Sequence, residues 1–377
     1  MSKSCKEINI LHAPDIHFGH PKVEPFLIYE HMEKYMFPEL MSGKINILSI
    51  TGDFFHSLLN MNSDAGVYAA LTIDRLISLA QYYKFYIRVI RGTFSHDRFQ
   101  NRFFTISKGA EVKLNDKPLV RVIDNIEIET FPDLDLSIMY CPDDQPYEDL
   151  TETLIDIIKS YHMDSVDVLL SHGYYDHMLP KNIPHIPTDT IFFDRISPYV
   201  KYFCLNGHVH TPSVYQNKCI SGGSFERMVH GEEEDKGFFV VTIDKQNDKT
   251  RYKFVINKEA LPFISIAPSK FKNLEDCFKY IDDLIIKLRA NDKDRKLFFR
   301  IIGDNDNIAA YLRESTHGVE VTTKSSIVQQ VVEEDISDVS CDLPVITEDN
   351  LPAMVIAGLK NTDILLTEQE VKEILDV

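Results

Sequence analysis

The sequence predicts an α/β protein with a two-layer β-sandwich flanked by helices, followed by a smaller α+β capping domain. Two observations predict the larger part: apolar strand-like runs alternate with helical stretches, and several runs end at a polar cluster. A third is the strand-rich, glycine-punctuated stretch 202–243, which indicates a second sheet layer. The 377 residues suffice for two folded units and a tail.

Four apolar runs, each followed by a polar residue, predict the strands that carry a site. The runs are 8–11 before Asp15, 45–50 before Asp53, 85–90 before His96 and 166–170 before His172. Helices are expected at 64–82 and 147–161. Because the carboxyl ends of neighbouring parallel strands share one edge of a sheet, these polar residues are expected to lie together.

The remaining chain predicts two further parts. A polar segment at 245–251 indicates a boundary, and a strand at 252–256 is expected to open the smaller domain. That domain continues with a helix at 273–289, capped by Asn273, and strands at 296–302 and 318–323. The expected domains are therefore 1–245, 246–330 and 331–377, the last an acidic linker and a partner-binding helix with a capping box at Thr367 and Glu370.

Charge, cysteine content and hydropathy limit the classes of protein to which the chain could belong. The net charge is −18, of which 331–377 carries −10, so the acidity does not exclude a local nucleic-acid site in the rest. Six scattered cysteines without CxxC spacing argue against a zinc knuckle or a disulfide framework, and Cys204 and Cys219 are expected to be reduced within strands. No apolar run could span a bilayer and the start is polar, so a soluble, cytoplasmic protein is expected.

The polar clusters have the chemistry of metal ligands. Asp15 and His17 stand two residues apart after a strand, so both point the same way. His208 and His210 follow Gly207 with the same spacing. Taken singly, a DxH, a Gly-Asp, an HxH or His172 also has an ordinary structural explanation. Taken as a series along alternating strands, they predict a binuclear metal site that Asp53 bridges.

Five short motifs and one longer stretch carry a resemblance to a known family. They are HAPDIHFG at 12–19, GDFFH at 52–56, SHD at 95–97, SHG at 171–173, GHVH at 207–210 and SGGSFERMVHGEEEDKGFFVV at 221–241. The chain resembles the calcineurin-like metallophosphoesterase superfamily, and more closely its SbcD-type nuclease subunits of DNA double-strand-break repair. The resemblance covers about residues 7–244, and the capping domain is similar in position and type.

The resemblance implies two divalent metal ions, with manganese expected, and a role for each motif residue. The implied ligands of one ion are Asp15, His17, Asp53 and His210, and those of the other are Asp53, His172 and His208. His96, oriented by Asp97, is expected to stabilise the transition state or protonate the leaving oxygen. His56 is expected near the scissile phosphate, although a surface histidine is the alternative.

One loop departs from the family pattern GNHD. Here Gly92 and His96 are separated by Thr93, Phe94 and Ser95, so Ser95 stands where the family has a ligating asparagine. Three alternatives remain open from the sequence. Ser95 coordinates, Thr93 coordinates through a rearranged loop, or water takes the position.

The expected function is a DNA nuclease, with 3′ to 5′ exonuclease and endonuclease activity in repair, recombination or replication. Candidate phosphate contacts are Arg98, Arg102, Lys108, Lys181 and Arg195, each with solvated surface charge as the alternative. Since no GxxxxGK[ST] motif occurs, the resemblance implies an SMC-like ATPase partner of the SbcC type and a homodimer of nuclease subunits within a heterotetramer. The unusual loop spacing is compatible with a viral member, which would act in the host cytoplasm.

Two other functions stay open from the sequence. One keeps the fold and changes the substrate to a phosphomonoester, a phosphoprotein or a cyclic nucleotide. The other is a catalytically decayed scaffold that binds DNA and the ATPase.

Overall fold

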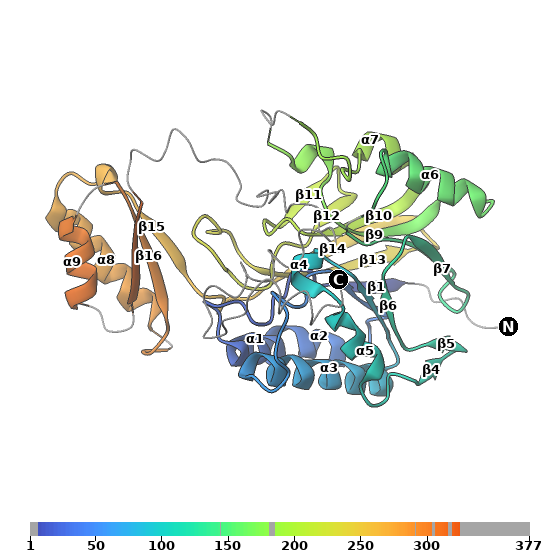
Figure 1. The fold of residues 1–377 in the computed structure, drawn as a ribbon, viewed down its shortest axis with the longest axis horizontal. Helices are drawn as coiled ribbons and strands as arrows, with labels where there is room; N and C mark the ends of the chain where they lie inside the picture. The colour runs from blue at the N-terminus through green and yellow to red at the C-terminus, as the bar shows by residue number, and fades with distance from the viewer. Residues whose placement is uncertain are drawn as a thin grey trace, which may run out of the picture. The chain divides into compact units, whose positions relative to one another are not determined.

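Two six-stranded mixed sheets and a smaller three-stranded sheet form the framework of the protein (Figure 1). The structure, a computed structural model, describes residues 7–143, 145–180, 185–290, 292–303, 306–315 and 319–324. The predicted α/β class, with mixed sheets flanked by helices, is confirmed.

The first sheet has the strand order β14-β13-β1-β2-β3-β6. Its strands are β1 (Ile8–His12), β2 (Ile47–Thr51), β3 (Tyr86–Ile90), β6 (Val120–Ile123), β13 (Gly237–Asp244) and β14 (Lys249–Ile256). The strands β1, β2, β3 and β6 are parallel to one another, and β13 and β14 run antiparallel to their neighbours. The carboxyl ends of β1 and β2 therefore lie at the same edge.

The second sheet has the order β11-β12-β10-β9-β8-β7. Its strands are β7 (Glu127–Phe131), β8 (Leu136–Cys141), β9 (Val166–His172), β10 (Val200–Gly207), β11 (Ser213–Tyr215) and β12 (Cys219–Ser221). The neighbours β9 and β10 are parallel, with Gly207 beside His172 in the register. Cys204 and Cys219 are also register partners, and both are free and buried, as predicted.

Helices pack on the outer side of each sheet (Figure 1). Beside the first sheet lie α1 (Pro25–His31), a π-helical turn (Met32–Met36), α2 (Phe37–Met41), α3 (Asp64–Tyr83) and α5 (Phe103–Ile106). Beside the second lie α6 (Leu150–Ser160) and α7 (Phe193–Ile196). The predicted helix at 64–82 begins after Ser63, whose side chain accepts from the backbone N–H of Gly66.

Alternation along the strands sends side chains from both sheets into one shared core. Ile10 of β1 and Ile47 of β2 belong to the same buried cluster as Leu170 of β9 and Leu205 of β10. The opposite faces of β1 and β2 contribute to a second cluster with α3. Two buried faces explain why these strands read as continuous apolar runs.

One expectation about the chain after β13 is wrong. Residues 252–256 do not open the smaller domain, because they lie in β14 and pair with β13 from Gly237 to Asp244. The polar segment contains the hairpin turn at 245–248 and the first residues of β14, and Asp244 Oδ1 accepts from the backbone N–H of Asn247 in the turn. A turn and a domain boundary share the same polar composition, which is why the sequence suggested a boundary. The domain limits 1–245, 246–330 and 331–377 stay predictions.

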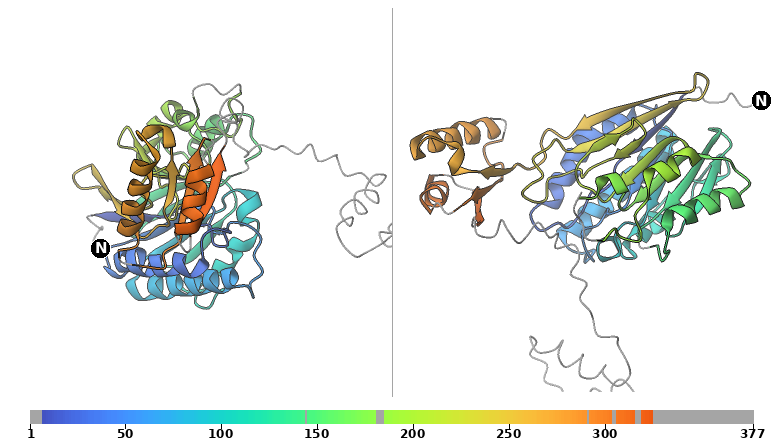
Figure 2. Two further views of the ribbon diagram at one scale, coloured as in Figure 1. Left: turned by 90° about the vertical axis from the view of Figure 1, so that its left-hand side faces the viewer. Right: turned by 90° about the horizontal axis from the view of Figure 1, so that it is seen from above.

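The smaller α+β part has a parallel sheet of its own, with the order β15-β16-β17 (Figure 2). Its elements are β15 (Phe263–Ile266), α8 (Leu274–Leu288), β16 (Leu297–Ile302), α9 (Asp306–Ser315) and β17 (Val319–Lys324). The predicted cap is confirmed, since Asn273 Oδ1 accepts from the N–H of Asp276. Residues of both helices and of the sheet form a separate apolar cluster.

Some predicted features cannot be compared with the structure. The predicted linker and helix at 331–377, with Thr367 and Glu370, lie outside the described residues, as does Lys181. Among the helices that the structure describes, none is long and apolar enough to cross a membrane.

Candidate metal centre

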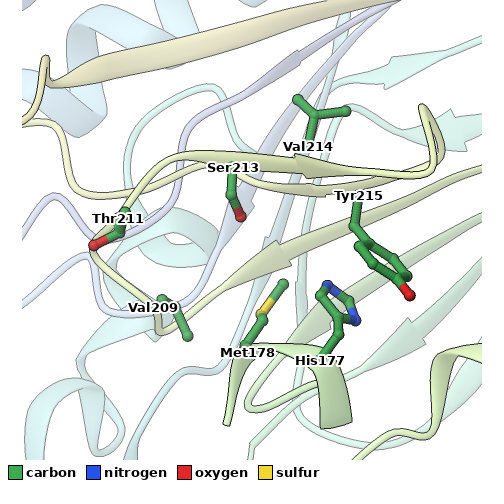
Figure 3. A pocket seen from close by; sticks show the side chains of 7 residues that line it. All are labelled: His177, Met178, Val209, Thr211, Ser213, Val214 and Tyr215. Carbon is green, nitrogen blue, oxygen red and sulfur yellow. The ribbon is translucent and has the colours of Figure 1, made fainter. Parts of the chain in front are cut away.

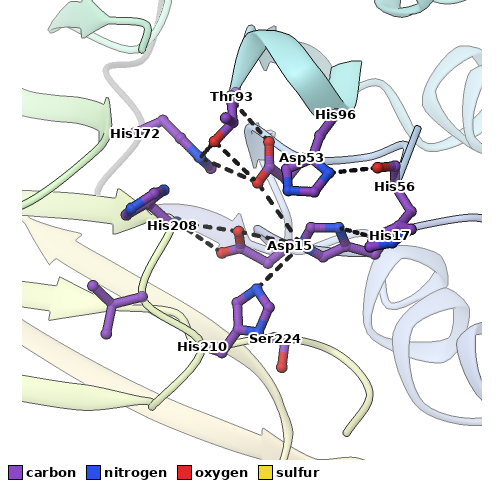
Figure 4. Close-up of polar contacts among 12 residues, drawn as sticks. Asp15, His17, Asp53, His56, Thr93, His96, His172, His208, His210 and Ser224 are labelled. Atoms are coloured by element: carbon purple, nitrogen blue, oxygen red, sulfur yellow. Dashed lines mark hydrogen bonds and ion pairs between the residues drawn. The ribbon is translucent and has the colours of Figure 1, made fainter. Parts of the chain in front are cut away.

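Two pairs of parallel strands, β1–β2 in the first sheet and β9–β10 in the second, carry the predicted ligands to one place (Figure 4). Asp15 follows β1, Asp53 follows β2, His172 is the last residue of β9 and His208 comes directly after β10. His17 and His210 stand two residues beyond Asp15 and His208. The structure thus brings all six predicted ligands together.

The backbone at four of these residues is in the left-handed region. The φ angles are 52° at Asp15, 55° at His17, 51° at Asp53 and 87° at His208. Each such residue costs on the order of 1 kcal/mol or more, and such outliers cluster at functional sites. The turns are held by backbone bonds, in which the N–H of Asp15 donates to Gly52 O and that of His17 donates to Asp53 O.

Three glycines let the backbone close around the same residues. A Cβ on Gly52 would lie 2.1 Å from His172 Nδ1, and one on Gly92 would lie 2.2 Å from Asp53 Oδ1. A Cβ on Gly207 would meet Thr51 O at 2.1 Å. These distances are far below van der Waals contact, so the packing requires residues without a side chain.

The donor atoms of the six predicted ligands form two neighbouring groups, Asp15–His17–His210 and Asp53–His172–His208. A third group joins His17 to His56 and His96. In the first, His17 Nε2 and His210 Nε2 lie 3.1 Å apart. In the second, His172 Nε2 lies 3.4 Å from Asp53 Oδ2. The same Asp53 oxygen is 3.8 Å from His17 Nε2, so it stands between the groups.

These spacings and donor types fit divalent metal ions. Ligands about 2.0–2.2 Å from one ion lie roughly 2.8–3.6 Å from each other in octahedral or tetrahedral geometry. Imidazole nitrogens with carboxylate oxygens suit zinc, manganese or iron. The buried aspartates and histidines could therefore hold metal ions, as the sequence predicted; the assignment of each residue to one ion stays a prediction.

The pKa values show charges that a cation would balance. Burial, helped by the charge of Asp53, raises the pKa of Asp15 to about 7, although nearby histidines oppose this. Burial also works to raise the pKa of Asp53, but the charge and hydrogen bond of His172 outweigh it and hold that pKa low. Conversely, Asp53 raises the pKa of His172 well above its usual value against the effect of burial. A metal ion between these side chains would supply the positive charge that Asp53 favours beside it.

A second layer orients the imidazoles. His210 Nδ1 lies 2.7 Å from Glu232 Oε1, and His172 Nδ1 lies 2.7 Å from Thr51 O. The fully buried Lys236 donates to His210 O at 2.9 Å and lies 3.3 Å from Glu232 Oε2. Such partners fix which ring nitrogen is free for a metal. Glu232 and Lys236 belong to the stretch 221–241, and no role for either was predicted from the sequence.

Asp97 holds the backbone around Asp53 in place. This buried carboxylate accepts from the backbone N–H groups of Asp53 at 3.0 Å, Phe55 at 3.1 Å and Gly92 at 2.8 Å. Among the described residues no hydrogen bond joins Asp97 to His96, and the expected role of Asp97 in orienting His96 stays a prediction. Instead, His96 Nδ1 bonds to the carbonyl of His56. Asp97 positions the turn that carries Asp53.

His56 and His96 border the first group. His56 Nδ1 lies 3.3 Å from His17 Nδ1, and the rings of His56 and His96 are 5.1 Å apart. Burial, with help from the charge of His96, lowers the pKa of His56 to about 4, so its imidazole is neutral at pH 7. The predicted residues are thus adjacent to the metal ligands, while their catalytic roles stay predictions.

The loop 92–96, which departs from the family pattern GNHD, places Thr93 rather than Ser95 at the centre. Thr93 Oγ1 lies 3.4 Å from His172 Nε2 and 3.5 Å from Asp53 Oδ2. Ser95 is exposed within the short helix α4 (Phe94–Asp97).

Three of the predicted phosphate contacts are exposed, and a fourth is held in ion pairs. Arg98, Arg102 and Lys108 are exposed. Arg195 is engaged by Asp149 at 2.9 Å and Glu152 at 3.0 Å, so it is a poor phosphate contact.

A cavity of about 350 Å³ adjoins the centre at Val209, the residue between His208 and His210 (Figure 3). Its lining residues are His177, Met178, Val209, Thr211, Ser213, Val214 and Tyr215. The His177 ring stacks on Tyr215 with centroids 4.0 Å apart. The cavity contains no carboxylate, lysine or arginine, which suits an uncharged organic group.

No family model matches the chain, and no curated protein matches it.

Proposed function

We propose that the protein is a nuclease that hydrolyses DNA phosphodiesters with two divalent metal ions, with manganese as the expected metal. The observation that supports this most is the position of Asp53 Oδ2 between two groups of buried aspartates and histidines. When bound, two ions in such an arrangement lower the pKa of a water molecule and neutralise charge on the reacting phosphate.

The proposed fold is the two-layer sandwich of metallophosphoesterases. It is supported by the apolar core that both sheets share and by a buried ion pair between Arg88 of β3 and Glu129 of β7. The motifs at 12–19, 52–56, 171–173 and 207–210 lie at the carboxyl ends of strands, as they would in that fold.

In this proposal His96 moves a proton. Its Nδ1 bonds to the carbonyl of His56, which makes Nδ1 the protonated nitrogen. Nε2 is then the atom that exchanges a proton with the leaving oxygen. His56, next to His17, would contact the phosphate.

DNA is favoured as the substrate by two features. The stretch 221–241 resembles nucleases rather than protein phosphatases, and it supplies Glu232 and Lys236 behind His210. The uncharged cavity beside Val209 would suit a base or sugar next to the scissile phosphate. The proposal extends to an SMC-like ATPase of the SbcC type and a dimer of nuclease subunits, with 331–377 as the docking segment.

The test is manganese-dependent hydrolysis of labelled duplex DNA beside hydrolysis of a small aryl phosphate monoester. We expect DNA cleavage that Asp53→Asn and His208→Asn abolish. Asp116→Asn and His162→Asn are matched controls, since both residues are exposed and have a left-handed backbone like the ligands.

Two outcomes would replace the proposal. Turnover of the monoester without DNA cleavage supports a phosphomonoesterase. DNA binding without any hydrolysis and with fewer than one metal ion per chain at saturating manganese supports a decayed scaffold.

A further inference from the structure

Three donor atoms of different chemistry form a nearly equilateral triangle at the second group. Thr93 Oγ1 is 3.5 Å from Asp53 Oδ2 and 3.4 Å from His172 Nε2. Asp53 Oδ2 and His172 Nε2 are themselves 3.4 Å apart. The three side chains point toward one another from separate strand ends (Figure 4).

These lengths are typical of a coordination polyhedron. Hydrogen bonds donated by a hydroxyl cluster at about 2.5–3.0 Å, so 3.5 Å is long for one from Thr93 to a carboxylate. Ligands about 2.1 Å from one ion lie roughly 3.0 Å apart in octahedral geometry and roughly 3.4 Å apart in tetrahedral geometry, so the sides of the triangle fit the wider spacing. The triangle therefore matches one face of a metal site better than a set of hydrogen bonds.

We infer that the Thr93 hydroxyl is an oxygen donor to the second metal position, beside Asp53, His172 and His208. This inference rests on the proposed two-metal function. It assigns to Thr93 the role that the sequence left open between Thr93, Ser95 and water.

The backbone explains why residue 93 takes this position. The Thr93 N–H donates to Asp53 Oδ1 at 2.8 Å, which leaves Oδ2 facing both metal groups. Its carbonyl accepts from the N–H groups of His96 and Asp97, so Thr93 is fixed as the residue before α4. Gly92 lets the loop approach Asp53, because any Cβ there would meet Asp53 Oδ1.

The position of Ser95 in α4 keeps its side chain away from the second metal position. Ser95 lies within α4 and its side chain is exposed, whereas Thr93 is partly buried at the centre. Moving Ser95 inward would require α4 to unwind, which would break the bonds that its N-terminal turn makes to Thr93 O.

The test measures manganese binding to the full chain without DNA, by calorimetric titration and by the electron paramagnetic resonance signal of coupled manganese pairs. Thr93→Val keeps the branched shape and removes the hydroxyl, and Thr93→Ser keeps the hydroxyl. Ser95→Ala is the matched control. We expect Thr93→Val to weaken the second ion about 10-fold or more and to reduce the coupled signal, with the first ion unchanged. Thr93→Ser and Ser95→Ala should bind as the wild type does.

The results separate this inference from the nuclease proposal. If Thr93→Val binds both ions like the wild type, or if Ser95→Ala weakens the second ion, the inference is overturned. If the wild type takes up fewer than two ions, there is no second position and the inference also fails. Should Thr93→Val not fold, Thr93→Ala gives the same comparison. Loss of the second ion in Thr93→Val supports the inference even when the wild type cleaves no DNA, an outcome that would contradict only the proposed substrate.

Discussion

Replacing Glu129 by glutamine should destabilise the protein strongly, because it leaves a buried guanidinium without its counter-ion. Arg88 is 1% exposed, and its Nε and Nη2 donate to the two Glu129 oxygens at 2.7 and 2.9 Å. Tyr140 donates to the same carboxylate at 2.8 Å. Removing one partner of such a pair costs about 3–5 kcal/mol of unfolding free energy. The measurement is urea denaturation of the wild type and of Glu129→Gln.

The pair also predicts how stability depends on pH. Burial works to raise the pKa of Glu129, but hydrogen bonds from Arg88 outweigh it and lower that pKa. A carboxyl with a lowered pKa in the folded state stabilises the protein above its unfolded value, about 4.3, and this contribution is lost as pH falls through the folded value. Wild-type stability should therefore fall in acid below about pH 4.3, and the fall should be smaller in Glu129→Gln.

Glu127 gives a matched control on the same strand. It pairs with Arg121 at 2.6 Å, yet its side chain is 33% exposed, so Glu127→Gln should cost about 1 kcal/mol or less. Replacing Arg88 by methionine together with Glu129 by leucine should recover most of the loss. A cost below about 1 kcal/mol for Glu129→Gln, or an equal cost for Glu127→Gln, would refute the reasoning.

Two predictions concern the metal centre. Glu232→Gln should weaken the ion beside His210 about 10-fold to 100-fold in a manganese titration, with the other ion little changed, and the exposed Glu233→Gln is the control. Unaltered binding in Glu232→Gln would contradict the positioning role. His96→Ala should lower the rate of DNA cleavage roughly 10²-fold to 10⁴-fold while both ions stay bound, and full activity would remove His96 from the proton transfer.

The elements predicted from the sequence are those that local signals define. The helix at 64–82 appears as α3 because Ser63 caps an amphipathic segment, and the predicted helix at 147–161 begins at Leu150 because Asp149 caps it. In contrast, β14 was assigned to the wrong sheet, since an apolar alternation does not specify its partner strand. α9 was not predicted at all.

In the candidate site, too, the features set by local sequence were predicted and those set by tertiary contacts were not. The six ligands were predicted because each follows an apolar run at a recognisable spacing. The partners of these ligands were not, because contacts such as that of Glu232 with His210 span 22 residues and depend on the tertiary fold. The choice between Thr93 and Ser95 depended on where α4 begins, and the sequence alone left that open.

The left-handed backbone at Asp15, His17, Asp53 and His208 restricts how this centre could change in evolution. Apart from glycine, which has no donor, asparagine, aspartate and histidine are the residues that tolerate this conformation best. A ligand here can therefore be exchanged with little conformational penalty only within that small set. An alanine would remove the donor and also disfavour the turn, so its effect on activity would combine two losses. Asparagine at Asp53 or His208 keeps the backbone preference and reports on the donor alone.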